Sequence, residues 1–542
     1  MKWFLVALLF VSPAVFAERC EPGPKQLFWG DLHIHTSFSM DAYVWNNQVT
    51  PAQALEFAQG HVQIASNGQQ LKLDRALDFA AVTDHAEYFA VIEACQVQQA
   101  DTAYCRALRE AAAEDSRRGF NDLFLPALLA GDRLCQVPGA DCVVQAKSLW
   151  QRTIDAANEA TQPCEFTAFV ANEWTASPDN LHWHRNLIYA NDTVPERAIN
   201  SFDEPDQLAL WQALAERCGD VPDCDVLAIP HNSNIGLGGA FDVSGHSAAQ
   251  LGARSRFEKL VEIHQHKGSS ECYPGSTLSD EDCEFEIMLP IPMLRALQAN
   301  PRDLTEAEQQ QVASGYVRDV LAKGLQIKQQ QGLNPFVYGF VGATDTHSGR
   351  PGAVTEDNWS GAIGTYDLSV ERLQTFTHYN PGGLTAVWAR ANTREEVFAA
   401  LQRRETYASS GPRIGLKFGV ASRAYGCAAL ERYAPMGSTY SGRASPHFVV
   451  HAQQDKVALQ QVDIVRLTLD EGNIEQQVIS WRTKKSGEAD WCVTWQDPGY
   501  DRKVPTAWYA RVLQAPTARW DGKKQIRERA WSSPVWSAAA LP

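Results

Sequence analysis

Short apolar runs alternate with segments of helical periodicity along most of the chain. Apolar runs that end in polar or ionisable side chains are typical of buried strands. They occupy residues 26–36, 77–85, 166–174, 226–231, 259–265 and 337–345. Helical patterns occupy residues 204–218, 287–298, 305–331 and 394–403. Thr50-Pro51 starts one more helix, which Gly60 ends. This alternation of strands and helices predicts a largely parallel sheet, either open or closed as a barrel.

The pattern changes after about residue 415. The apolar runs become short and partly alternating, which is typical of a small all-β, sandwich-like module. These runs are residues 446–452, 462–469, 476–481, 491–495 and 506–513. We therefore predict an α/β part over residues 18–415, with a helical insertion at about 87–150, and a β-rich C-terminal domain over residues 416–542.

The N-terminus has the features of an export signal. Lys2 precedes an apolar run at residues 3–11, and Val15-Phe16-Ala17 matches a signal cleavage site. The run is well under the roughly 18 residues that a membrane span needs, so a signal peptide over residues 1–17 is favoured over a membrane anchor. We expect a mature chain that begins near Glu18, is periplasmic or secreted, and has no membrane attachment after cleavage.

All 12 cysteines follow this segment. An even number of cysteines in an exported chain favours disulfides over buried free thiols. Local spacing suggests Cys95 with Cys105, Cys135 with Cys142, Cys218 with Cys224, and Cys272 with Cys283. Cys427 and Cys492 are the only cysteines of the C-terminal region and can pair within it.

Charge narrows the class of partner. The chain has 64 acidic and 48 basic residues and a net charge of -16. A nucleic acid polymer is disfavoured, because affinity for phosphate backbones depends on clustered lysine and arginine. A small anion can still bind where bound cations dominate the local field. The sequence leaves the oligomeric state open.

Histidines and carboxylates gather at the ends of the predicted strands. Seven of the 14 histidines lie in five such motifs. The motifs are His33-Ile34-His35 with Asp41 downstream, Thr83-Asp84-His85, Pro230-His231-Asn232, the segment from Glu262 to Lys267, and Asp345-Thr346-His347, and a further run contains Glu173. Residues two apart on a strand project to one face, so His33 and His35 can reach one ion. Because the carboxyl ends of parallel strands meet at one edge, this grouping predicts a multinuclear metal site.

The ordered motifs resemble the PHP (polymerase and histidinol phosphatase) superfamily of metal-dependent phosphoesterases. The matching strings are HIH with Asp41, TDH, Glu173, PHN and GATDTH, over roughly residues 26–415. GDLHIHTSFSMDA, LDFAAVTDHAEY, IPHNSN, QHKGSSEC and RRETYASSGPRI are similar to an exported branch of that superfamily with a β-rich C-terminal extension. The resemblance implies a distorted seven-stranded (β/α) barrel that holds three metal ions.

The resemblance also implies which residues hold each ion. One ion is held by His33, His35, Glu173 and Asp345. Glu173 bridges to a second ion held by His231 and His266, with His264 as the alternative to His266. The third ion is held by Asp41, His85 and His347. Imidazole and carboxylate ligands suit zinc, manganese or iron, and the sequence does not choose among them.

Other polar residues beside these motifs are candidates for handling a tetrahedral anion, which matches a guanidinium geometrically. The substrate-binding candidates are Lys267, Arg185, Asn232, Asn234 and Arg350. The candidates for a role in catalysis are Asp84, Lys267, Arg185 and His184, where Asp84 orients a ligand and His184, near His182, donates a proton to a leaving alkoxide. Solvated surface charges and ordinary polar strand residues are the alternative explanation for each of these side chains.

The function that these features favour is an exported phosphoesterase. It hydrolyses a small phosphomonoester or phosphodiester with metal-activated water. The alternatives are another metallohydrolase, of the sulfatase or amidohydrolase type, and a non-catalytic periplasmic protein that binds metal or sugar. An amidohydrolase site is disfavoured, because no clear bridging lysine is present and the TDH and DTH ligands would be unexplained.

Overall fold

The computed structural model describes residues 20–65, 68–114, 141–290, 304–363, 378–483 and 487–541. The predicted signal peptide, Cys135 and most of the predicted helix at 287–298 lie outside these residues.

Five N-terminal strands take part in parallel pairs. β1 (Gln26–Ile34), β4 (Phe79–Val82) and β5 (Thr167–Phe169) form one parallel set, and β9 (Leu260–Gln265) pairs with β11 (Gly339–Gly342). A parallel bridge between Ile34 and Thr346 joins the end of β1 to the segment after β11. The chain therefore brings the carboxyl ends of distant strands to one place.

Other strands of this part are antiparallel, which corrects the prediction of a largely parallel sheet. β6 (Ala171–Trp174), β7 (Arg185–Tyr189) and β8 (Val226–Pro230) form an antiparallel sheet, and β12 (Leu384–Ala389) runs antiparallel to β1. The connection from β6 to β7 is too short for a helical crossover, which needs about a dozen residues, so the chain reverses. The described strands are hydrogen-bonded in separate sheets, and a closed seven-stranded barrel stays a prediction.

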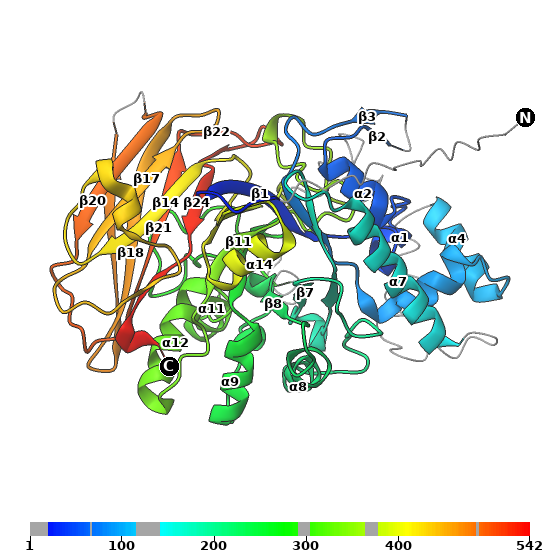
Figure 1. Cartoon of the computed structure of the whole chain (residues 1–542), viewed down its shortest axis with the longest axis horizontal. Coiled ribbons are helices and arrows are strands. Elements are labelled where there is room, and N and C mark those ends of the chain that lie inside the picture. The colour runs from blue at the N-terminus through cyan, green and yellow to red at the C-terminus, as the bar shows by residue number, and fades with distance from the viewer. Residues whose placement is uncertain are drawn as a thin grey trace, which may run out of the picture.

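Helices lie around the N-terminal strands, and one of them, α12, also packs against the C-terminal strand β18 (Leu459–Asp470) (Figure 1). They are α1 (Met40–Val44), α2 (Pro51–Ala58), α3 (Phe89–Ile92), α4 (Ala103–Glu114), α7 (Cys142–Ala160), α8 (Gln207–Leu214), α9 (Ala248–Phe257), α11 (Glu306–Ala313), α12 (Val317–Gln331) and α14 (Arg394–Gln402). The predicted helix at 305–331 is interrupted at Gly315, where a Cβ would lie 2.2 Å from the Ser233 carbonyl oxygen. The close approach of these two backbones therefore requires glycine at the break between α11 and α12.

The C-terminal part is rich in strands, as predicted. One sheet contains β14 (Gly415–Ala421), β15 (Ala434–Pro435), β17 (His447–Gln453) and β20 (Asp490–Gln496). The other strands are β13 (Thr406–Ser409), β16 (Thr439–Tyr440), β18 (Leu459–Asp470), β19 (Asn473–Arg482), β21 (Thr506–Gln514), β24 (Arg529–Ser532) and β25 (Val535–Ser537), which extend the sheet of β1. The pairs β12–β13 and β13–β24 link the two parts into a single large sheet.

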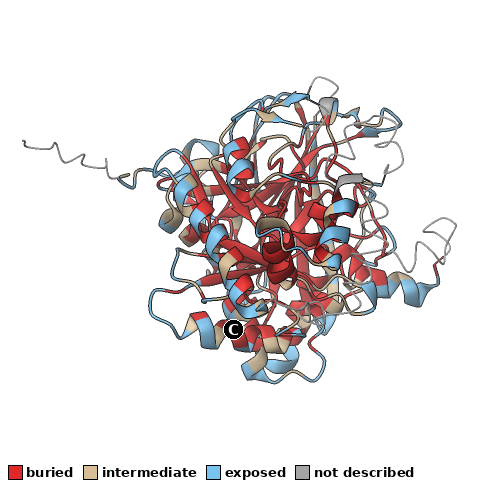
Figure 2. Ribbon diagram, turned by 90° about the vertical axis from the view of Figure 1, so that its right-hand side faces the viewer, coloured by how far each residue is buried: buried red, intermediate tan, exposed pale blue. Residues whose placement is uncertain are grey.

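Buried residues fill the centre of the molecule, and many of the exposed residues lie on the outer faces of its helices (Figure 2). Short pairs complete the strands, namely β2 (Gln63–Ile64) with β3 (Gln70–Leu71), β10 (Gly268–Ser269) with β9, and β22 (Thr517–Ala518) with β23 (Gln525–Ile526). Across the described ranges, no helix is both long and apolar enough to cross a membrane.

Five disulfides join cysteines that both lie within the described residues. Four were predicted, namely Cys95–Cys105, Cys218–Cys224, Cys272–Cys283 and Cys427–Cys492. The fifth, Cys20–Cys164, joins residues 144 positions apart, and local spacing gave no signal for it. Disulfides in this number are typical of proteins that fold in an oxidising environment.

Candidate metal centre

His33 and His35 present their Nε2 atoms to one point at the end of β1. The two nitrogens lie 3.2 Å apart. Asp345 Oδ1 lies 3.2 Å from each of them, and Glu173 Oε2 lies 3.4 Å from His33 Nε2 and 3.3 Å from His35 Nε2. These four residues are the set predicted for the first ion, and the fold brings them together from three separate segments, namely the end of β1, β6 and the segment after β11.

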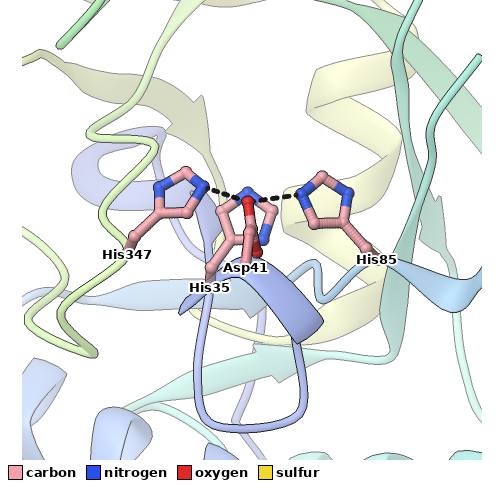
Figure 3. Close-up of side chains that lie close together, drawn as sticks. All are labelled: His35, Asp41, His85 and His347. Atoms are coloured by element: carbon pink, nitrogen blue, oxygen red, sulfur yellow. Dashed lines mark hydrogen bonds and ion pairs between the residues drawn. The ribbon is translucent and has the colours of Figure 1, made fainter. Parts of the chain in front are cut away.

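A second group lies on the other side of His35 (Figure 3). Asp41, from α1, places Oδ2 3.1 Å from His85 Nε2 and 2.9 Å from His347 Nε2. The His35 ring stacks against both imidazoles, with centroid distances of 4.5 Å to His85 and 4.2 Å to His347. The three residues predicted for the third ion therefore lie together next to His35.

A third group forms around the other oxygen of Glu173. Glu173 Oε1 lies 2.8 Å from His184 Nδ1 and 3.2 Å from His231 Nε2. His184 directly precedes β7, which pairs with the strand that carries Glu173. His184 was predicted as a proton donor, and this geometry makes it a candidate ligand instead.

His266 lies beside Asp345 and His347. Its Nε2 is 3.3 Å from Asp345 Oδ2, and its ring centroid is 5.8 Å from that of His347. The structure thus groups His266 with Asp345 and His347, which differs from the predicted pairing with His231.

His264 faces the C-terminal part. Its ring centroid lies 5.4 Å from that of Phe285 and 5.7 Å from that of Trp531. β9 ends at Gln265, and its register with β11 shifts at His264, so His264 and His266 do not share one face. Of the two alternatives, His266 is the residue that reaches the metal centre.

The Nδ1 atoms of His33, His35 and His347 are held by neighbours that turn Nε2 inward. Glu262 Oε2 lies 3.0 Å from His33 Nδ1, and Ser39 Oγ lies 2.8 Å from His35 Nδ1. His347 Nδ1 lies 2.9 Å from the Asp345 carbonyl oxygen. Such partners fix the tautomer and orientation of a metal-binding imidazole. Sequence reasoning missed the roles of Glu262 and Ser39, although both lie within the quoted motifs.

Asp84 acts on the centre through Ser39. It accepts hydrogen bonds from Ser39 Oγ at 2.9 Å and from the backbone nitrogen and hydroxyl of Thr36 at 2.6 Å each. Both of its oxygens are engaged in these bonds, so Asp84 is a positioning residue, in agreement with the prediction that it orients a ligand.

Two residues of the centre lie on strained backbone. Asp345 has φ 53° and Asn232 has φ 52°, in the left-handed region that is uncommon for residues other than glycine. Asp31 braces the first of these turns, because it accepts hydrogen bonds from Thr344 N at 3.1 Å and from Thr344 Oγ1 at 2.6 Å. Burial raises the pKa of Asp31 to about 6.

The carboxylates of the centre are ionised, and its imidazoles fall into a neutral and a protonated class. Burial opposes ionisation of Glu173 and Asp41, yet the neighbouring imidazoles hold the pKa of each carboxyl well below its usual range. Burial, together with His33 for His231 and with Lys267 for His266, lowers the pKa of both imidazoles to about 3.

Burial opposes protonation of His33, His35 and His85, but the neighbouring carboxylates outweigh it and raise the pKa of His33 and of His35, and that of His85 to about 10. Imidazoles bind metals in the neutral form, so a bound ion would replace the proton on each of these three rings.

Several buried polar atoms at the centre lack hydrogen-bond partners, namely Glu173 Oε2, Asp345 Oδ1 and His266 Nε2. An unsatisfied buried carboxylate oxygen costs roughly 1–3 kcal/mol or more. A divalent cation would satisfy such oxygens, so the donor set fits the predicted metal ions.

The candidate anion-binding residues have different environments. Lys267 makes an ion pair with Asp345, at the edge of the centre. Asn232 Nδ2 lies 3.4 Å from His182 Nδ1. Arg350 donates to Ser348 Oγ at 2.9 Å and to Ser360 Oγ at 2.7 Å.

The environments of Arg185 and Asn234 do not match the substrate-binding role predicted for them. The Arg185 guanidinium is fully buried and bonds to Glu258 Oε1 at 3.1 Å and to the Ala240 carbonyl oxygen at 2.7 Å. Asn234 Nδ2 donates to the carbonyl oxygens of Lys267 and Met288, both at 3.1 Å. These donor groups are used in tertiary hydrogen bonds within the protein. They therefore stabilise the fold and are not available to a substrate.

Comparisons with known proteins give a family. A family model described as "Protein of unknown function (DUF3604)" matches residues 22–482 and 480–539. An uncharacterized protein of Chlamydia pneumoniae is 32% identical over 171 residues, which are 29% of this chain and 23% of that protein, so the match spans under a quarter of the relative.

One solved structure aligns along most of the chain. It is a two-domain protein from Bacteroides vulgatus, described as containing a predicted PHP-like metal-dependent phosphoesterase. The alignment covers 94% of this chain and 98% of that chain, with 10% identity and a TM-score of 0.30. A TM-score this low does not establish a shared fold.

Proposed function

The chain belongs to the DUF3604 family of proteins of unknown function, and we propose that it is a metal-dependent hydrolase of small phosphomonoesters or phosphodiesters. The observation that carries the proposal is the placement of two carboxylates between groups of imidazoles. Glu173 directs Oε2 to His33 and His35 and Oε1 to His184 and His231. Asp345 directs Oδ1 to His33 and His35 and Oδ2 to His266. Carboxylates that face two ways are suited to bridging neighbouring ions.

The chemistry follows from this donor set. Neighbouring divalent ions, when bound, lower the pKa of a water molecule and offset negative charge on ester oxygens. Zinc, manganese and iron all accept imidazole and carboxylate ligands. A protein that only stored metal would not need carboxylates shared between groups.

Lys267 is the residue that we assign to the substrate anion. Its ammonium group contacts Asp345, and its side chain is 15% exposed, whereas the ligands around it are almost fully buried. It can therefore meet both the centre and an arriving ester. An ammonium acts on a phosphoryl oxygen as a point charge.

Metal content and ester specificity test the proposal together. The purified chain is loaded with zinc, manganese or iron and assayed on aryl phosphate monoesters and diesters, aryl sulfates and anilides. We expect stoichiometric metal and turnover of the phosphate esters. Turnover of sulfates or anilides alone would replace the phosphoesterase assignment, and metal binding without any turnover would favour a binding protein.

Glu173→Gln is the decisive variant. Loss of the shared charge is expected to lower metal content by at least one ion per chain and activity by at least a hundredfold. His451→Ala serves as the control, because His451 pairs with Asp490 on the surface of β17 and touches no residue of the centre. Full metal content and activity in Glu173→Gln would contradict the assignment.

We also propose that the chain is exported. The five disulfides and the sequence of residues 1–17 support this. N-terminal sequencing of protein recovered from the periplasm or the medium should give a start near Glu18. Recovery of the uncleaved chain from the cytoplasm would contradict export.

A further inference from the structure

His182 lies beside the metal centre and is not one of its candidate ligands. It lies in the loop between β6 and β7, two residues before His184, and the two rings stack with centroids 4.4 Å apart. None of the groups of described side chains that could share an ion includes His182. His182 is partly exposed, whereas His184 is buried, so His182 lies on the outer side of the centre.

The backbone of the loop that carries His182 is strained. Asp179 and Asn180 are consecutive left-handed residues, with φ 53° and φ 60°. Leu181 N donates to the Pro178 carbonyl oxygen at 2.9 Å and closes the turn. Strain of this kind persists only where the surrounding structure holds it, and it is concentrated at functional sites. The loop is therefore held in an unusual conformation immediately before His182.

Asn232 orients the His182 ring. Its Nδ2 atom lies 3.4 Å from His182 Nδ1. An amide nitrogen can only donate, so Nδ1 accepts and the ring proton is on Nε2. Asn232 is 2% exposed and lies in the strained turn directly after His231. Among the described residues, none bonds to His182 Nε2, so this N–H donor is unused.

The turn after β8 also connects His182 to Lys267. Asn232, at the start of this turn, contacts His182, and Asn234 Nδ2 donates to the Lys267 carbonyl oxygen at 3.1 Å. The Lys267 side chain is partly exposed, as His182 is. Burial and His184 lower the pKa of His182 well below its usual range, and the positive charge of Lys267 acts in the same direction. The Lys267 ammonium and the His182 Nε2–H are therefore two donors on one side of the centre.

We propose that His182 is a second binding residue for the tetrahedral anion of the substrate, donating from Nε2 to one of its oxygens while Lys267 pairs with its charge. Asn232 is then a positioning residue that acts through His182. The inference rests on the proposed function, because it concerns the same centre. The role needs a hydrogen-bond donor and no change of charge on the ring. A phosphoryl group offers several oxygens to such a pair of donors, whereas an amide offers a single carbonyl oxygen.

Binding of inorganic phosphate to the metal-loaded mature protein tests the anion site without turnover. In isothermal titration calorimetry at pH 7, His182→Phe should weaken phosphate binding at least tenfold at unchanged metal content, because it keeps a ring on His184 and removes both nitrogens. His182→Gln, whose amide can donate from near the position of Nε2, should recover much of the loss. His246→Phe is the matched control, since His246 is also partly exposed and packs against an aromatic ring, that of Trp211, outside the metal centre.

Asn232→Gly separates positioning from structure. Glycine adopts the left-handed conformation of position 232 without the steric cost of a Cβ, so stability against urea should change little. Phosphate binding should nevertheless weaken severalfold, because the His182 ring loses its partner. A merely structural asparagine would give the opposite result, lower stability with the same affinity for phosphate. This variant decides the case if His182→Phe does not fold.

Turnover gives a second measurement. With an aryl phosphate, His182→Phe should raise KM by a larger factor than it lowers kcat. Four outcomes would overturn the inference: wild-type phosphate affinity in folded His182→Phe, loss of metal from that variant, an equal loss of affinity in His246→Phe, and no phosphate binding by the metal-loaded wild-type protein. Phosphate binding that depends on His182 without any turnover would refute the hydrolase and leave this inference intact, whereas turnover with phosphate binding independent of His182 would do the reverse.

Discussion

His33 and His35 are each positioned through Nδ1, the ring nitrogen that faces away from the metal centre. The hydroxyl of Ser39 is the clearest case, because it contacts His35 Nδ1 at 2.8 Å, accepts from His85 N at 3.0 Å and donates to Asp84 at 2.9 Å. One hydroxyl therefore connects two candidate ligands and a buried carboxylate. A residue of this kind sets the affinity for metal without touching the ion.

Ser39→Ala should weaken metal binding by about ten- to a hundredfold, the usual effect of removing a partner of a ligand. Competition with a chelator measures it. Ser37→Ala is the matched control, because the Ser37 hydroxyl is equally buried and has no hydrogen-bond partner. Equal affinities in the two variants would mean that Ser39 does not position His35.

At the scale of elements, apolar runs and caps predicted much of the fold. The runs that became β1, β4, β8 and β9 are buried along most of their length. The predicted start and end of α2 are also confirmed, with Thr50 and Gln53 forming a capping box and Gly60 at φ 86°. β7 was missed, since Arg185 and Asn186 interrupt its apolar pattern. These polar residues lie in a buried strand because β7 pairs with β6 and β8 and because the buried Glu258 carboxylate accepts a hydrogen bond from Arg185.

Thr50→Ala tests the contribution of the capping box to stability. Loss of the bond from Gln53 N to the Thr50 side chain should lower the free energy of unfolding by about 1 kcal/mol. Urea denaturation measures the change. Thr193→Ala, at an exposed threonine, should change it by less than about 0.5 kcal/mol. A loss at Thr50 no greater than that at Thr193 would show that the cap adds no stability.

At the scale of the whole molecule, a buried ionic network connects the two parts. Glu271 accepts hydrogen bonds from Arg318 at 2.7 Å and from Arg511 at 3.0 Å, and its other oxygen accepts from Trp531 Nε1 at 2.7 Å. Arg318 lies on α12, whereas Arg511 and Trp531 lie on β21 and β24. The network and the β13–β24 pair join the C-terminal strands to the N-terminal part, so the two parts share one interior.

This network makes stability depend on pH. Burial favours the neutral form of Glu271, but Arg511 and Arg318 outweigh it and lower the pKa of the carboxyl below its unfolded value. A depressed pKa stabilises the fold above the unfolded pKa of about 4.3, and that stabilisation is lost as the pH falls toward the folded pKa.

Glu271→Gln should remove this part of the pH dependence and one of the carboxylates that balance Arg318 and Arg511, while Asp280 still pairs with both and Asp463 with Arg511. Removing one partner of an isolated buried pair costs about 3–5 kcal/mol, and the loss here should be smaller because other carboxylates remain. Denaturant unfolding between pH 3 and 7 measures both effects, with Glu475→Gln on the exposed face of β19 as the control. An unchanged slope of stability against pH in Glu271→Gln would contradict the role of this carboxylate.

The sequence by itself determined the kinds of ligand and the strand ends that carry them, because apolar periodicity and the order of the motifs are local properties of the chain. It also predicted four of the disulfides. Three join cysteines that are close in the sequence, and the fourth joins the two cysteines of the C-terminal part. Which imidazoles share a carboxylate was decided only by the tertiary structure. His184 lies beside Glu173 because the chain reverses between β6 and β7 and pairs the two strands. His266 lies beside Asp345, just after β9 ends at Gln265. The direction of a side chain beyond a strand end depends on such turns and register shifts, which pairing with distant segments sets.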